Sequence, residues 1–339
     1  MKTRARDARI DYVRVASILY ILLHHADDYS TQFLRLTPSL ALADDIVTWA
    51  ALTSMFAISG FLTFKPSESD AASGWTHMQR RFARLYPPFA IAVVLFQLAG
   101  VFPQGWRAVL VNLALLGPWV GPNAATLWFV EVLLFFHVVY AIWLLIRTWR
   151  GHPWTIPLFT GVATFGLALL GRAAGLTIDS RLGLYLPAFA GGACLGAAQL
   201  FRADRPERTR RLAGFVGTTV LLGFGAWLLP LWTDHLLPLS MAVSVLTTLL
   251  LGVFLSLPQG EPVVAVRARQ FAHLVAYGSF MAYLVHRFVY LYVWKAVALL
   301  GEPWVSVALV ASIPLAIAAG VVLQRGYDAL GYARPAKVR

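Results

Sequence analysis

The sequence predicts an all-α fold, a polytopic transmembrane helical bundle of about ten spans with both termini in the cytoplasm. Three observations support this fold class. The 339 residues are 59% hydrophobic and only 13% charged, whereas about a quarter of the residues in a typical soluble domain are charged. Apolar runs long enough to cross a bilayer recur along the whole chain. Basic residues gather in alternate connections between these runs, as the positive-inside rule expects.

The apolar runs define the order of the spans along one membrane domain, residues 1–339, that leaves no room for a separate soluble domain. The stretch 106–120 is short and carries Trp106 and Trp119, so we predict an interfacial or re-entrant segment there. The predicted spans are roughly 10–26, 43–64, 85–102, 125–147, 153–173, 182–201, 212–231, 236–257, 271–295 and 303–323.

The placement of charge predicts the orientation of the bundle. With the N-terminus inside, most of the 28 basic residues lie on the cytoplasmic side, including those of the connections 65–84 and 202–211. A full crossing by residues 106–120 would place the Arg-rich connection 202–211 outside, which argues against it. Membrane topology thus explains the basic excess, so we expect a multi-pass protein of the plasma or inner membrane. Its partner is the lipid bilayer and not nucleic acid; its oligomeric state is left open.

Several classes of chemistry find no support in the sequence. The single cysteine, Cys194, cannot form an intramolecular disulfide or a thiolate cluster, and its small neighbours are typical of a helix-packing position. The chain contains no metal-binding histidine motif, no P-loop and no nucleophile elbow. We therefore expect no metal ion.

The first predicted span carries an arginine and a histidine. Arg14 and His25 are eleven residues apart, about three helical turns, so both side chains project from one face roughly 16 Å apart. Polar groups on one stripe of a membrane helix are costly and by default face a polar cavity. We expect both residues to be catalytic and to border one hydrated passage from the cytosol.

Two acidic residues follow the histidines of this span. Asp28 lies three residues after His25 and four after His24, spacings at which helical side chains meet. A carboxylate can orient an imidazole, so we predict that Asp28 orients His25. The alternative is a helix-end cluster solvated by water. We favour a functional role for His25 and a structural one for His24.

An arginine cluster precedes the third span. Arg80, Arg81 and Arg84 have helical spacings of three and four residues, and arginine forks suit phosphate oxygens. The cluster is therefore a candidate substrate-binding site for an anionic ligand. A positive-inside anchor for lipid headgroups is the alternative.

Four other polar residues inside apolar segments are candidate substrate-binding residues. Ser59, beside Gly60, also suits close helix packing. Glu131 is a carboxylate within a span and would line a cavity. Tyr283 and His286 share a helical face near the outer end of their span.

At these residues the chain resembles the acyltransferase-3 family of integral-membrane O-acyltransferases. The resemblance runs from Arg9 to about His286. Two features depart from the pattern of the family. Tyr12-Val13-Arg14-Val15 lacks the glycines that many members place around the first-helix arginine. Glu131 follows Trp128 by only three residues, whereas many members have a longer Trp-Ser-Leu-x-x-Glu element. The matching elements are Arg9-Ile10-Asp11-x-x-Arg14, His25, Phe56-Ala57-Ile58-Ser59-Gly60-Phe61-Leu62, Arg80 to Pro87, Leu127-Trp128-Phe129 and Tyr283-Leu284-x-His286.

The resemblance implies transfer of an acyl group, commonly acetyl, from cytoplasmic acyl-CoA to a hydroxyl of an extracytoplasmic glycan, glycolipid or other cell-envelope acceptor. It implies an essential role for Arg14 and His25, and handling of acyl-CoA by Arg80, Arg81 and Arg84. Acyl-CoA, in the simplest case acetyl-CoA, would be the donor substrate.

Two chemical roles for His25 remain open from the sequence: general base on the acceptor hydroxyl, or carrier of an acyl-histidine intermediate. A transporter or flippase of a polar or anionic solute is the alternative function, because buried Arg, His and Glu could also line a solute path. A scaffold protein whose polar residues only pair internally is a third interpretation.

Overall fold

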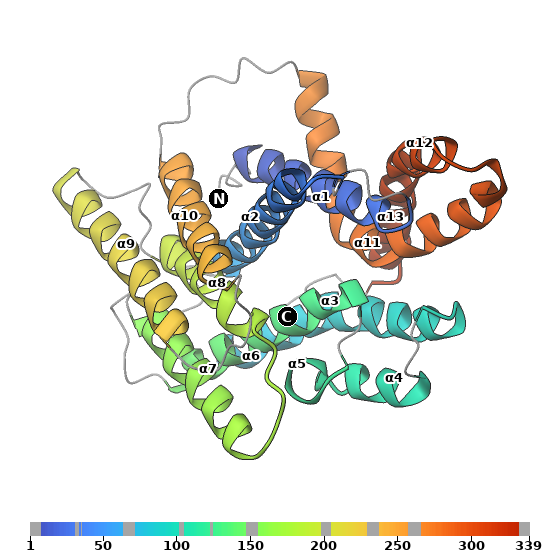
Figure 1. Ribbon diagram of the computed structural model, residues 1–339. Coiled ribbons are helices and arrows are strands. Elements are labelled where there is room, and N and C mark those ends of the chain that lie inside the picture. Colours follow the sequence, from blue (N-terminus) through green and yellow to red (C-terminus); the bar gives the residue numbers. More distant parts are fainter. Residues whose placement is uncertain are drawn as a thin grey trace. The chain divides into compact units, whose positions relative to one another are not determined.

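A computed structural model describes residues 8–30, 34, 36–63, 72–101, 105–122, 125–146, 155–197, 205–228, 237–256 and 266–331. Every regular element in these ranges is a helix, as the sequence predicts (Figure 1). The chain divides into two compact units, and the boundary falls within one continuous helix, between Met55 and Phe56.

The first unit combines an N-terminal and a C-terminal segment of the chain. It holds the first part of α2, up to Met55, and α11 contacts α1, α12 and α13 within it. Its helices are α1 (Ala8–Asp27), α2 (Pro38–Thr63, shared with the second unit), α11 (Val266–Val297), η3 (Ala298–Leu300), α12 (Trp304–Ala311) and α13 (Ile313–Ala329).

The second unit begins at Phe56 within α2 and runs to Ser256. In it α3 packs along α6, and α8 contacts α6, α7, α9 and α10. Its further helices are α3 (Ala72–Leu98), α4 (Gly105–Leu113), α5 (Gly117–Val120), η2 (Ala125–Leu127), α6 (Trp128–Ile146), α7 (Thr155–Ala173), α8 (Arg181–Ala197), α9 (Arg205–Leu228) and α10 (Leu237–Ser256).

Helices α1 and α11 run parallel. Near the start of both, His273 Nδ1 lies 3.2 Å from Asp11 Oδ2, and near their ends Tyr290 donates a hydrogen bond to the Leu22 carbonyl oxygen. Two parallel helices that both cross a membrane must have an odd number of crossings between them. A full crossing by residues 106–120 would make the number in the predicted order even.

Glycine permits the closest helix contacts in each unit. A Cβ added at Gly320 of α13 would lie 2.4 Å from the backbone nitrogen of Ala282 in α11. In the second unit, a Cβ at Gly60 of α2 would lie 2.0 Å from the Phe189 carbonyl oxygen in α8. Small residues at such crossings let two backbones approach closely, which is how helices associate in membranes.

Five helical stretches of the described residues are long and apolar enough to cross a membrane. Each overlaps a span predicted from the sequence. The full count of ten spans and the orientation stay predictions. The five stretches are Pro38–Thr63, Trp128–Ile146, Pro238–Leu255, Val266–Leu300 and Trp304–Ala329.

The two basic connections 65–84 and 202–211 are partly helical. Helix α3 begins at Ala72 and α9 begins at Arg205. Each arginine cluster is therefore the first part of the helix that continues into the next predicted span. A membrane helix can extend beyond the apolar core without an interruption, because arginine is a good helix former. The stretch 106–120 forms two short helices, α4 and α5, separated by Leu115 in a left-handed backbone conformation. Neither is long enough to cross a bilayer alone.

Candidate active site

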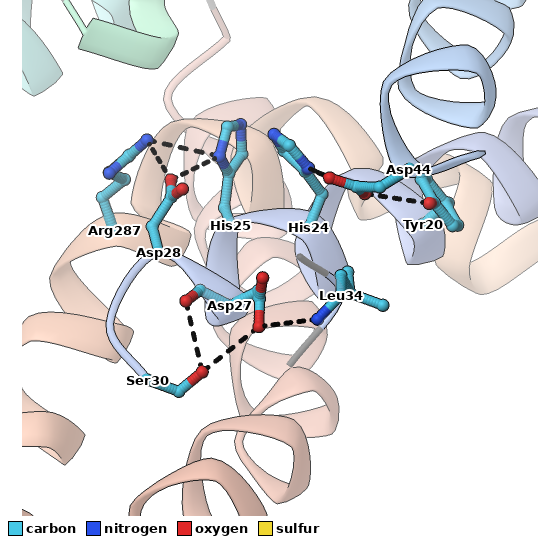
Figure 2. A network of polar contacts seen from close by, with 9 residues as sticks. All are labelled: Tyr20, His24, His25, Asp27, Asp28, Ser30, Leu34, Asp44 and Arg287. Atoms are coloured by element: carbon cyan, nitrogen blue, oxygen red, sulfur yellow. Dashed lines mark hydrogen bonds and ion pairs between the residues drawn. The ribbon is translucent and has the colours of Figure 1, made fainter. Parts of the chain in front are cut away.

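His25 lies in the last turn of α1 and contacts an acidic and a basic residue. Its Nδ1 is 3.1 Å from Asp28 Oδ2, the contact that the three-residue spacing predicts. Arg287 of α11 donates a hydrogen bond from Nη2 to the same Asp28 oxygen at 2.8 Å, and this Nη2 lies 3.2 Å from His25 Nδ1. Figure 2 shows the three side chains converging.

The charge state of Asp28 decides which nitrogen of His25 is available. Partial burial alone would raise the pKa of Asp28, but its hydrogen bond with His25 and the charge of Arg287 lower this pKa to about 2. The ionised carboxylate can therefore accept a hydrogen bond from His25 in the tautomer that carries its proton on Nδ1. In that tautomer Nε2 carries the free lone pair.

His286 of α11 packs face to face with His25. The ring centroids are 5.1 Å apart and the ring planes differ by 19°. His286 Nδ1 lies 2.6 Å from the Tyr283 carbonyl oxygen, so it donates there, and Nε2 is buried without a hydrogen-bond partner among the described residues. The predicted contact between Tyr283 and His286 is also present, with ring centroids 5.7 Å apart.

His24 has a different partner from the one its spacing allows. Its Nδ1 lies 3.0 Å from both carboxylate oxygens of Asp44 in α2, not beside Asp28. Tyr20 donates a hydrogen bond to Asp44 at 2.9 Å, and Asp44 is only 3% exposed. The rings of His24 and His25 meet edge to face, with centroids 5.0 Å apart.

Arg14 contacts α11 two turns before His286. Its Nη2 donates a hydrogen bond to Ser279 Oγ at 2.9 Å, and Ser279 is buried. Between Arg14 and His25 on this stripe lie Ile18 and Ile21, both buried. The stripe is therefore interrupted by packed aliphatic side chains, and it does not form the continuous hydrated passage expected from the sequence. Arg14 and His25 occupy two separate polar positions of α1.

The histidine cluster has the spacing of a cation site. His24, His25 and Asp28 each bring one ligand atom within 4.8 Å of the others. Arg287 already pairs with Asp28 and places a positive charge beside these atoms, which opposes a bound cation. The absence of a metal requirement stays a prediction.

In the second unit, the predicted arginine cluster lies on one helix. Arg80, Arg81 and Arg84 all belong to α3, so their three- and four-residue spacings place them on neighbouring turns. Arg80 and Arg84 are exposed. Arg81 is half-buried and donates a hydrogen bond to the Leu62 carbonyl oxygen at the end of α2.

Ser59 belongs to a chain of polar side chains inside the second unit. Its Oγ is 3.3 Å from Nε2 of His137 in α6, and Nδ1 of His137 is 3.4 Å from Nε2 of His77 in α3. Both histidines are buried. The sequence marked Ser59 as a candidate but did not connect it with His77.

Glu131 lies in the first turn of α6 and is only 1% exposed. Its two carboxylate oxygens have no hydrogen-bond partner among the residues described. The carboxylate packs against the backbone of α5, since a Cβ on Gly117 would lie 2.4 Å from Oε2. A buried carboxylate of this kind is costly and suits a site that a ligand completes.

Sequence reasoning missed Arg287, Ser279 and Asp44. Each is close to a predicted residue only through packing of one helix on another, so local spacing carries no signal for the contact. Arg287 offered a partial clue, because it directly follows the candidate His286 in a predicted span.

Comparison with known proteins assigns the family. The family model Acyl_transf_3, described as an acyltransferase domain, matches residues 7–323. No match was found among curated proteins or among solved structures. The family match covers nearly all described residues of both units, including each residue of the candidate site. The chain therefore belongs to the acyltransferase-3 family and is a membrane acyltransferase.

Proposed function

We propose that this acyltransferase moves an acetyl group from cytoplasmic acetyl-CoA to a hydroxyl of an extracytoplasmic glycan, glycolipid or other cell-envelope acceptor in the plasma or inner membrane. The contact that carries the proposal is the one between His25 and Asp28. It holds the imidazole by Nδ1 and leaves Nε2 with a lone pair for chemistry.

The reacting hydroxyl would meet His25 at the end of α1. Its Nε2 either removes the hydroxyl proton as a general base or first takes the acyl group. His286 and Tyr283 would border the acceptor, because His286 stacks on His25 and its buried Nε2 has no hydrogen-bond partner in the described part of the chain. Asp28 would orient His25.

The arginines would hold the donor. Acyl-CoA is anionic at its nucleotide end, and guanidinium groups bind phosphates through paired hydrogen bonds. Arg80 and Arg84 are exposed residues one helical turn apart on α3, with Arg81 beside them. Under the positive-inside rule this end of α3 faces the cytoplasm, where acyl-CoA is found. Arg14, Ser59 and Glu131 would each contribute to substrate binding within their own unit.

The proposal is tested with purified full-length protein in lipid nanodiscs. Acetyl-CoA is supplied with a detergent extract of envelope glycans and lipids from a strain that lacks this gene. We expect thiol release that depends on the extract, together with new acetyl esters detected by mass spectrometry. His25→Gln should lower thiol release by at least about a hundredfold, the lower range for loss of a general base.

The matched control is His273→Gln, which removes an imidazole paired with a carboxylate at the other end of the same two helices. It should retain activity. If the wild-type protein releases no thiol with any extract but moves solute across vesicles, the acyltransferase proposal is wrong and the transporter alternative is supported.

A further inference from the structure

We propose that His24 is a second catalytic imidazole, one that takes the proton of the acceptor hydroxyl while His25 carries the acyl group. This inference rests on the proposed function, because it divides one acyl transfer between two neighbouring side chains. It assigns chemistry to a residue that the sequence favoured as structural.

The first support is the carboxylate behind His24. Asp44 approaches Nδ1 with both oxygens at 3.0 Å, and Tyr20 contacts the same carboxylate. Asp44 is nearly completely buried and His24 is half-buried, so the carboxylate of this pair is shielded from water while the imidazole stays accessible. A buried aspartate at Nδ1 fixes the tautomer whose Nε2 accepts a proton, and it stabilises the imidazolium that forms.

The second support is the different surroundings of the two rings (Figure 2). His25 shares Asp28 with the cation Arg287, whereas the side chains joined to His24 in this network are acidic or neutral. A carboxylate partner favours a ring that becomes positive by taking a proton. A cation beside the ring favours return to the neutral imidazole, which an acyl carrier must do when it releases its acyl group.

The third support is proximity. The two ring centroids are 5.0 Å apart, and a ring nitrogen of each lies within 4.8 Å of the other. One hydroxyl group placed between them can contact both rings, because a hydrogen bond spans about 2.8 Å.

The proposed cycle balances as follows. Nε2 of His25 attacks the thioester carbonyl, the C–S bond breaks, and CoA leaves as a thiolate that takes a proton from solvent. The acceptor oxygen then attacks the acyl-His25 carbonyl. The C–O bond forms, the C–N bond breaks, and the hydroxyl proton passes to His24, which releases it to solvent before the next turnover.

Two acceptors separate the role of His24 from that of His25. Hydroxylamine attacks an acyl-imidazole without a general base, whereas a sugar or lipid hydroxyl needs one. With acetyl-CoA and envelope extract, His24→Gln should lower ester formation by at least about a hundredfold. With acetyl-CoA and hydroxylamine, thiol release by the same variant should be little changed. With extract as the acceptor, protein denatured rapidly near neutral pH should carry more acetyl label on His25 in this variant than in the wild type.

Asp44→Asn provides an independent variant, because an amide that donates to Nδ1 moves the ring proton of His24 to Nε2. It should show the same selective loss. Asp11→Asn, in the carboxylate–imidazole pair with His273 at the other end of α1, is the matched control and should change neither activity.

Full ester formation by His24→Gln overturns the inference. So does an equal loss with both acceptors, which would mark His24 as a structural tie between α1 and α2. Either result differs from failure of the proposed function itself, in which the wild-type protein releases no thiol with hydroxylamine or with extract.

Discussion

The imidazole rings of His25 and His286 stack with their centroids 5.1 Å apart and their planes 19° from parallel. This contact joins α1 to α11 at the point where both candidate catalytic histidines and Arg287 meet. His286 is fully buried, and its Nδ1 faces a carbonyl oxygen. Its Nε2 is therefore an acceptor, and it is buried without a hydrogen-bond partner among the described residues.

His286→Phe should lower kcat/KM for the acceptor by about tenfold or more, because the ring stack is kept but the acceptor nitrogen is lost. Steady-state kinetics with a series of extract concentrations measures this effect. Tyr290→Phe is the control, since it removes only the hydrogen bond to the Leu22 carbonyl oxygen. It should lower the free energy of unfolding by about 1 kcal/mol and leave kcat unchanged. Equal kinetic effects of the two variants would contradict a substrate-facing role for His286.

The Asp28–Arg287 pair should make stability pH-dependent in the acid range. The hydrogen bond with His25 and the charge of Arg287 lower the pKa of Asp28 to about 2, below its ordinary value, so the folded protein favours the ionised form. Its contribution is complete above about pH 4 and is lost as the pH falls towards 2. The difference in Tm between the wild type and Asp28→Asn in nanodiscs should therefore be constant near neutral pH and shrink below about pH 4. A constant difference down to pH 2 would show that the pair does not hold Asp28 ionised.

Loss of one donor-binding arginine should act mainly on donor affinity. Arg84→Gln should raise the KM for acetyl-CoA by about tenfold, the scale of one charge-assisted hydrogen bond, with less effect on kcat. Acetyl-dephospho-CoA, which lacks the ribose phosphate, reports which phosphate is bound. If Arg84 binds the ribose phosphate, Arg84→Gln should show the same KM for acetyl-CoA and for acetyl-dephospho-CoA. Arg267→Gln removes an exposed basic residue of α11 and should leave the KM for both donors unchanged. A comparable rise in KM for this variant would show that net positive charge, and not a specific contact of Arg84, holds the donor.

The close contact between α11 and α13 should not tolerate a methyl group. Gly320→Ala would force its Cβ to 2.4 Å from the backbone nitrogen of Ala282, so the helices must separate, and the Tm should fall. Gly326→Ala, on the same helix, meets no atom within 4 Å. It should raise stability slightly, because alanine favours a helix over glycine by about 1 kcal/mol. Thermal unfolding of both variants in nanodiscs tests this contrast, and equal Tm values would contradict the packing.

A chelator should leave activity unchanged. His24, His25 and Asp28 are close enough to share a cation, but the chemistry proposed for them needs free imidazole nitrogens. Dialysis against EDTA should therefore preserve thiol release, and added Zn²⁺ should inhibit by occupying those nitrogens. Loss of activity on dialysis with recovery on metal addition would overturn this expectation.

The candidate site was only partly predictable from local sequence. The His25–Asp28 contact follows from a three-residue helical spacing, and so does the contact between Tyr283 and His286. By contrast, Asp44 is 20 residues from His24, and Ser279 is 265 residues from Arg14. No periodicity links residues so far apart. For this reason local spacing favoured a structural role for His24, because its carboxylate partner, Asp44, lies on another helix.

The sequence by itself determined that this protein is a helical membrane protein. Its apolar runs are long enough to cross a bilayer, and within a bilayer a helix satisfies the backbone hydrogen bonds of each run. It also placed Arg14 and His25 on one face of the first helix and assigned the family. Only the tertiary structure decided which helices meet. Apolar faces are nearly interchangeable in lipid, so the choice of partner depends on close contacts such as that of Gly320 with Ala282. Those contacts place His286 and Arg287 beside His25. They also bury the isoleucines that lie between Arg14 and His25 on α1.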